Sequence, residues 1–227
     1  MNINTFCKFG SVAVVLAAAS SQAMAVEPFS ADYRASAMGM QGDGQMSITS
    51  KGNGRWEYSL TINNSLVDMS QKTVFDEKGG VLRPLSSTDL SRVLIKKKTV
   101  SADYNWDQKQ VTWSGDVKPG RAGPVALNKG DMDALLVNLA IVRDVAAGKP
   151  LKYRLVENGK ARPMSYSVAG KENITIAGQT REATKVVRTS GNKETIVWIV
   201  AGMPAPARIL QREDGRDSID LQVKSFR

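Results

Sequence analysis

From residue 26 onward, hydrophobic and polar side chains mostly alternate, which is the pattern of strands with one buried face. In the clearest run every second side chain is apolar: Trp56, Tyr58, Leu60 and Ile62. Residues 102–106 and 111–113 repeat this alternation on either side of a polar turn. The pattern therefore predicts a chain built mainly from short β-strands joined by hairpins.

The later part of the chain continues the same rhythm. Asn158-Gly159 separates two alternating segments, and this dipeptide suits a two-residue hairpin turn because both residues tolerate positive φ. Further strands are predicted at 172–176, 182–189, 194–200, 207–212 and 218–226. Pro204 and Pro206 lack the amide hydrogen that a central strand needs, so they are expected at a sheet edge or a bend. Gly39, Gly42 and Gly44 indicate a loose turn between the first two strands.

One segment departs from the alternation. In residues 131–147 the apolar side chains recur at helical spacing: Met132, Leu135, Leu136, Leu139, Val142 and Val145. Asp131 is the expected N-cap, Asp133 adds negative charge to the first turn, and residues 148–150 end the helix. A single helix with a wide apolar stripe is expected to cover the concave face of the sheet. The predicted fold is therefore mainly β, with a strongly curved antiparallel sheet or half-barrel that encloses one amphipathic helix.

The first 25 residues differ from the rest. Lys8 precedes a short apolar stretch at 12–19, and Ala23-Met24-Ala25 supplies a small-x-small exit. This order predicts a signal peptide cleaved after Ala25, because the apolar stretch is too short to span a bilayer. Residues 26–227 then form a single β-rich domain in the periplasm, where Cys7 has been removed with the signal.

Composition narrows the chemistry. The chain has no histidine, and its only cysteine is Cys7, so a His-dependent Ser or Cys nucleophile cannot be built. No metal or cofactor is expected. Lys and Arg outnumber Asp and Glu by 31 to 22, and removal of Lys8 takes the formal charge from +9 to +8. After export this excess favours lipid or lipopolysaccharide phosphates over nucleic acid.

Several ordered segments resemble a bacterial exported family, domain of unknown function 3108. They are the segments 29–33, 104–107, 131–148, 156–160, 178–187, 196–199 and 206–209. The resemblance covers most of the chain after residue 25. It implies a curved antiparallel sheet that holds a helix, similar in outline to the half-barrels of periplasmic lipoprotein carriers. Because the family has no assigned activity, the resemblance implies no catalytic residues.

Candidate ligand-binding residues come from two features. The first is a set of aromatic side chains on the apolar faces of strands, which are either core or the lining of an apolar cavity: Trp56, Tyr58, Tyr104, Trp106 and Trp198. The second is the run Lys96-Lys97-Lys98, in which Lys96 and Lys98 share one side of a strand. These lysines either meet an anionic head group or protect an edge strand from pairing.

Three functions remain open. The first is non-catalytic binding or carriage of a hydrophobic or amphipathic envelope molecule. The second is a structural or assembly module that binds another envelope protein at a strand edge marked by Pro204 and Pro206. The third is a hydrolase that uses only carboxylates, with Asp107, Asp131 and Asp133 as candidates.

Overall fold

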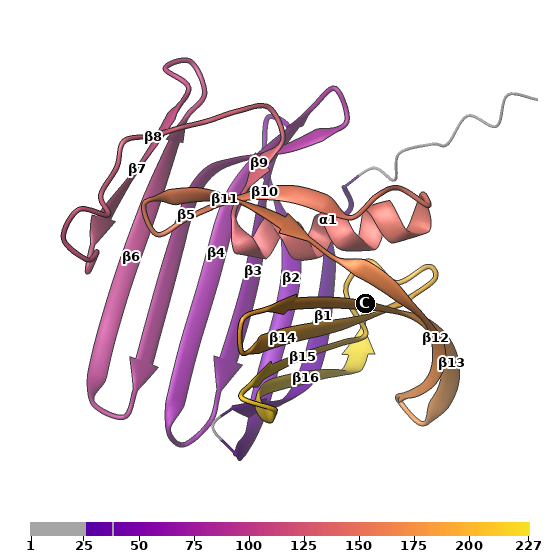
Figure 1. Ribbon diagram of the computed structural model, residues 1–227. Coiled ribbons are helices and arrows are strands. Elements are labelled where there is room, and N and C mark those ends of the chain that lie inside the picture. Colours follow the sequence, from indigo (N-terminus) through magenta and orange to yellow (C-terminus); the bar gives the residue numbers. More distant parts are fainter. Residues whose placement is uncertain (1–25, 38) are drawn as a thin grey trace, which may run out of the picture.

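A large antiparallel sheet dominates the computed structural model, which describes residues 26–37 and 39–227 (Figure 1). Its thirteen strands follow the order β12-β13-β14-β15-β16-β1-β2-β3-β4-β5-β6-β7-β8. The two end strands, β12 and β8, do not pair with each other, so the sheet is not closed into a barrel. The predicted signal peptide, residues 1–25, lies outside the described residues.

The strands are mostly long and joined by tight turns. The large sheet contains β1 (Phe29–Ala37), β2 (Met40–Gly52), β3 (Arg55–Asn63), β4 (Val67–Lys78), β5 (Val81–Val93), β6 (Lys96–Asn105), β7 (Gln110–Gly115), β8 (Val125–Ala126), β12 (Ser167–Ile176), β13 (Gln179–Ser190), β14 (Lys193–Val200), β15 (Arg208–Glu213) and β16 (Arg216–Phe226). A smaller sheet contains β9 (Asp131–Met132), β10 (Lys152–Glu157) and β11 (Lys160–Ser165). The helix α1 spans Ala134–Ala146.

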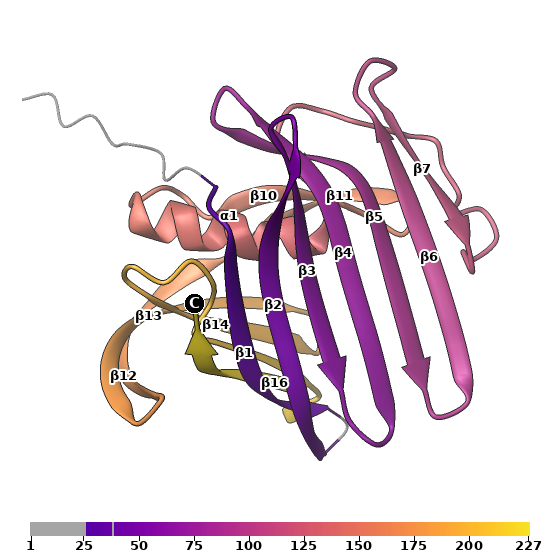
Figure 2. The same cartoon turned by 180° about the vertical axis from the view of Figure 1, so that it is seen from behind.

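The sheet is strongly curved, and its concave side is filled. Figure 1 shows β14, β15 and β16 running crosswise in front of the broad face made by β2 to β6. The helix α1 and the β10–β11 hairpin lie on this same side, and the view from behind in Figure 2 places both beyond the strands. Among the described residues, no helix has the length and apolar character needed to cross a membrane.

The core follows from the alternation in the sequence. Inward side chains of β1 to β4 pack beneath α1, and Tyr33, Tyr58 and Phe75 are fully buried there. The β1–β16 pairing brings the two ends of the described chain together, with Ala31 opposite Phe226. A second, smaller apolar cluster lies under β6 and β7 and includes Tyr104 and Trp113. The predicted mainly β fold with one enclosed helix is confirmed.

The predicted hairpins are also confirmed, including the Asn158-Gly159 turn, whose φ values are 51° and 69°. The predicted helix start is wrong by two residues. Asp133 caps α1, while Asp131 belongs to β9 and pairs in parallel with Arg154 of β10. Asp131 is buried, so it closes the small sheet instead of beginning the helix.

Two other predictions need correction. Gly42 and Gly44 lie inside β2 and not in a loose turn. A Cβ at Gly42 would lie 2.0 Å from the Asn63 carbonyl oxygen, so glycine permits a close approach of β3. Pro204 and Pro206 lie in the connection between β14 and β15, which are interior strands. Pro206 therefore marks a bend and not a sheet edge, and its carbonyl accepts a 2.7 Å hydrogen bond from the Tyr33 hydroxyl.

Candidate functional site

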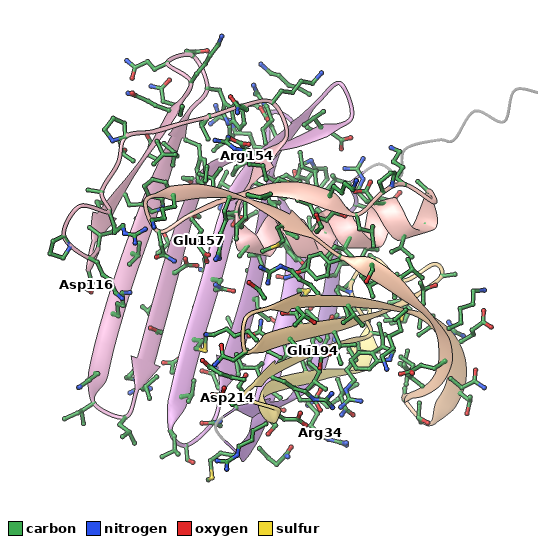
Figure 3. All side chains as sticks on the ribbon, in the orientation of Figure 1. Arg34, Asp116, Arg154, Glu157, Glu194 and Asp214 are labelled. Carbon is green, nitrogen blue, oxygen red and sulfur yellow. The ribbon has the colours of Figure 1, made fainter. Side chains whose placement is uncertain are left out.

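An open cavity of about 410 Å³ lies on the concave side of the sheet. Strands β3 and β4 form its back, α1 and the β10–β11 hairpin bound one side, and β13 to β16 bound the other (Figure 1). In Figure 3, Glu157 lies at the end of β10 on one side of the opening and Glu194 lies on β14 at the other. The volume falls in the range of roughly 300–1,000 Å³ typical of small-molecule sites.

The floor of the cavity is apolar. Its lining side chains come from five strands and the α1-facing side of the sheet: Leu60, Ile62, Met69, Leu155, Met164, Ile209, Ile219 and Leu221. Ile62 lies opposite Met69 across β3 and β4, and Ile209 lies opposite Leu221 across β15 and β16. The inward phase of strands that are distant in sequence therefore creates one continuous apolar surface.

The rim of the cavity is charged. Seven ionisable side chains line it: Glu157, Arg162, Arg188, Lys193, Glu194, Arg212 and Glu213. Three ion pairs join six of them, with N···O distances of 3.1 Å for Arg162–Glu157, 3.3 Å for Lys193–Glu213 and 3.2 Å for Arg212–Glu194. The opening thus combines an apolar floor with a polar edge, which is the arrangement that suits an amphipathic molecule.

Arg188 is the seventh charged side chain of the rim. It is half-buried and continues the inward phase of the buried Val186 on β13. Within residues 26–37 and 39–227, no carboxylate lies within ion-pairing distance of its guanidinium. Burial raises the pKa of the neighbouring Tyr166, and the positive charge of Arg188 opposes that rise. The cavity therefore holds a positive charge that an anionic ligand can neutralise.

Asp133 fixes the helix over the back of the cavity. One carboxylate oxygen accepts a 2.8 Å hydrogen bond from the Leu136 amide, and the other accepts a 2.5 Å hydrogen bond from the Thr73 hydroxyl on β4. Both Thr73 and Asp133 are buried. Burial raises the pKa of Asp133 to about 6, and the negative charges of Asp89 and Glu157 add to this rise.

Asp133 should make the stability of the protein depend on pH. Its pKa is higher in the folded state, so the unfolded state releases this proton first and rising pH favours unfolding. Between about pH 4.5 and about pH 7.5, wild-type protein should lose about 2 kcal/mol of unfolding free energy that Asp133→Asn does not lose. Urea denaturation at both pH values measures the difference. Asp107→Asn, on an exposed turn, is the matched control, and identical pH profiles for wild type and Asp133→Asn would contradict the assignment.

Asp131 has a structural environment. Its Oδ2 accepts a 2.8 Å hydrogen bond from the Asn128 amide and a second hydrogen bond from Arg154, so the carboxylate ties the loop before β9 to β10. Its other oxygen is buried without a hydrogen-bond partner among the described residues. In that same part of the chain, no group of three Asp, Glu, Cys or His side chains is arranged to hold a metal ion.

The sequence of residues 29–216 matches the family described as Protein of unknown function (DUF3108). The chain belongs to this family. No curated protein matches the sequence.

Solved structures are similar to this DUF3108 protein only in fold. The crystal structure of a beta-barrel-like protein of domain of unknown function DUF1849 from Brucella abortus is 10% identical, with a TM-score of 0.55 over 88% of this chain and 97% of that chain. MucB matches with a TM-score of 0.36 and 9% identity, over 88% of this chain and 52% of MucB. The MucA/MucB complex of Pseudomonas aeruginosa gives 0.38 and 10%, over 88% and 51%.

The candidate aromatic residues of this DUF3108 protein lie in packed positions away from the large cavity. Tyr58 is fully buried, and its hydroxyl contacts the Met46 sulfur at 2.7 Å. Trp56 is half-buried against the same core. Tyr104 belongs to the second apolar cluster and lines a hollow of about 20 Å³ beside Asp133. None of these three side chains lines the large cavity.

The two remaining tryptophans have polar partners outside the cavity. The Trp106 indole donates a 2.7 Å hydrogen bond to the Pro84 carbonyl. Trp198 is buried, donates to Glu172 and lies 4.8 Å from the Arg208 guanidinium carbon. Lys96 and Lys98 are exposed at the start of β6 and do not line the cavity. The structure therefore does not gather the predicted residues into one site, and their contact with a ligand stays a prediction.

Sequence reasoning missed the residues that do line the cavity. Arg188 had a detectable signal, because it occupies an inward position in the alternation of β13 where an apolar side chain is expected. Ile62 and Ile209 had no such signal. They alternate like any core residue, and only the curvature of the sheet leaves space in front of them.

Proposed function

We propose that this DUF3108 protein binds, without catalysis, a hydrophobic or amphipathic molecule of the cell envelope in the cavity between α1 and the sheet. The observation that carries the proposal is the combination of an apolar floor, a charged rim and the unpaired Arg188 within the described residues. An acyl chain or similar apolar group lies on the floor, and an anionic group pairs with Arg188. The protein acts in the periplasm after its signal peptide is cleaved at Ala25.

Burial supports this assignment of the two parts of the ligand. Leu155 and Leu221 are almost fully buried at the floor, while Glu157 and Glu194 of the rim are half-exposed. Transfer of apolar ligand surface from water to the floor supplies affinity of roughly 25 cal/mol per Å². A charged head group at the rim keeps contact with water and avoids the cost of full desolvation.

Arg188→Gln should weaken binding of an anionic ligand specifically. A hydrogen bond to a charged group contributes about 1.5–3 kcal/mol, so affinity for a dansyl-labelled long-chain fatty acid should fall about 10-fold or more. Affinity for the uncharged methyl ester of that probe should change little. Fluorescence titration with both probes measures the two effects. Arg34→Gln is the matched control, because Arg34 is exposed on β1 and does not line the cavity (Figure 3).

The comparison of acid and ester decides the outcome. An equal loss of affinity for both probes would indicate that Arg188 only supports the shape of the cavity. Unchanged affinity for both would remove Arg188 from the site. A hydrolytic release of the dansyl acid from its ester, abolished in Asp133→Asn, would instead support the carboxylate-only hydrolase.

An assembly module is the second candidate, and one observation favours it. The edge strand β12 pairs only with β13, and nearly all of its side chains are exposed. An unpaired strand edge can accept a strand from another protein. Crosslinking in intact cells through residues of β12 separates the candidates, because a single dominant protein adduct would favour assembly over ligand carriage.

A further inference from the structure

The tip of the β5–β6 hairpin exposes large apolar side chains to solvent. Val93 is 36% exposed, Leu94 is 62% exposed and Ile95 is 95% exposed. These are consecutive residues at the turn, followed directly by Lys96, the first residue of β6. We call residues 92–98 the basic apolar tip.

The sequence of this turn is unfavourable for an isolated hairpin. Leu94 has a φ of 55°, a conformation that a branched side chain adopts at a cost and that Asn or Gly would adopt easily. Full exposure of Ile95 also forgoes the gain from burial. Two unfavourable features at one turn indicate that Leu94 and Ile95 serve a contact outside this chain.

Hydrogen bonds hold the tip in place. The Leu94 amide donates a 2.8 Å hydrogen bond to the Leu66 carbonyl in the neighbouring β3–β4 turn. In that turn, the Asn64 side chain donates at 3.2 Å to the carbonyl of Met40, which is itself 41% exposed at the next turn. Figures 1 and 2 show all three turns at the same end of the sheet. The apolar side chains are therefore presented together on a connected rim.

Positive charge surrounds the apolar turn. Arg92 forms an ion pair of 3.1 Å with Asp68. Lys96, Lys97 and Lys98 are exposed and lie within ion-pairing distance of no carboxylate in residues 26–37 and 39–227. Asp116 is the nearest acid in the register, and it accepts a hydrogen bond from the Thr99 amide just beyond the run. Three lysines thus flank the turn on the β6 side.

We propose that the basic apolar tip docks the protein on an anionic lipid bilayer. Leu94 and Ile95 enter the interface between head groups and acyl chains, and the three lysines contact lipid phosphates. This combination of apolar insertion and electrostatic attraction is the chemistry of interfacial membrane binding. The proposal does not depend on which molecule fills the cavity.

The shape of the tip favours a bilayer over a protein partner. A stable protein interface buries roughly 800 Å² on each partner, whereas the exposed apolar side chains here lie on a single protruding turn. A fluid lipid interface can surround such a protrusion without a matching groove. Cavity and tip are also adjacent, because Ile62 and Met69 of the floor lie close to the β3–β4 turn to which Leu94 is bonded.

Vesicle sedimentation tests the proposal with the full exported chain. The vesicles contain phosphatidylglycerol mixed with phosphatidylcholine, or phosphatidylcholine alone. Wild-type protein should sediment with the anionic vesicles, and the double variant Leu94→Ser/Ile95→Ser should partition about 10-fold less or weaker. The triple variant Lys96→Gln/Lys97→Gln/Lys98→Gln should lose the preference for anionic over neutral vesicles and the sensitivity to salt. Val168→Ser, at an exposed apolar residue of β12, is the matched control and should bind like wild type.

Three results would overturn membrane docking. One is absence of wild-type binding to anionic vesicles, and another is equal binding by wild type and both tip variants. The third comes from analytical ultracentrifugation without vesicles. If wild-type protein is dimeric and the Leu94→Ser/Ile95→Ser variant is monomeric, then the tip is an interface between copies of this chain. Neither set of substitutions touches the cavity, so probe binding there stays an independent test of the proposed function.

Discussion

Ile219→Trp is expected to lower the affinity of the protein for a dansyl-labelled fatty acid by about 100-fold or more. Ile219 lies on β16, is half-buried and lines the cavity opposite the back strands. An indole at this position fills space that the apolar part of the ligand otherwise occupies. Loss of about four buried methylene groups, at about 0.8 kcal/mol each, accounts for an effect of this size.

The control for this prediction carries the same change at a site outside the cavity. Val168→Trp places an indole on the exposed side of β12, and its probe affinity should equal that of wild type. Unfolding midpoints of both variants, measured in urea, show whether each remains folded. Wild-type affinity in a folded Ile219→Trp variant would place the ligand elsewhere.

Leu136→Ala is expected to lower the free energy of unfolding by about 2–5 kcal/mol, because it removes a fully buried side chain and leaves a cavity. Leu136 lies on the first turn of α1, directly after the Asp133 cap, and belongs to the main core cluster. Its contribution fixes the helix against the concave face and so maintains the wall of the ligand cavity. Chemical denaturation monitored by tryptophan fluorescence measures the change.

The same substitution at an exposed leucine separates burial from helix or strand propensity. Leu94→Ala, at the tip of the β5–β6 hairpin, should change stability by less than about 0.5 kcal/mol. A similarly small effect for Leu136→Ala would mean that α1 does not pack on the sheet in solution.

Local chemistry was sufficient to predict most strands and the helix. The alternation of Tyr58, Leu60 and Ile62 predicts β3 because neighbouring side chains on a strand point to opposite faces. Asn158-Gly159 predicts the β10–β11 turn because both residues adopt positive φ. Such signals depend on residues close in sequence, so they do not require knowledge of the tertiary fold.

Features that depend on distant partners were not predictable in the same way. Asp131 and Asp133 both suit a helix cap, and only the pairing of β9 with β10 places Asp131 in a strand. Gly42 suggests a turn until β3 approaches its backbone. Leucines and isoleucines of the cavity floor alternate like ordinary core residues, and the predicted aromatic candidates fill interior space that the curved sheet closes around them.

Native mass spectrometry of protein purified from exporting cells in detergent-free buffer is the most direct test of ligand binding in the cavity. The account predicts a chain that begins at Val26 and carries a hydrophobic adduct, which organic solvent removes and which Ile219→Trp greatly depletes. Wild-type protein that carries no adduct and binds no added fatty acid would contradict it.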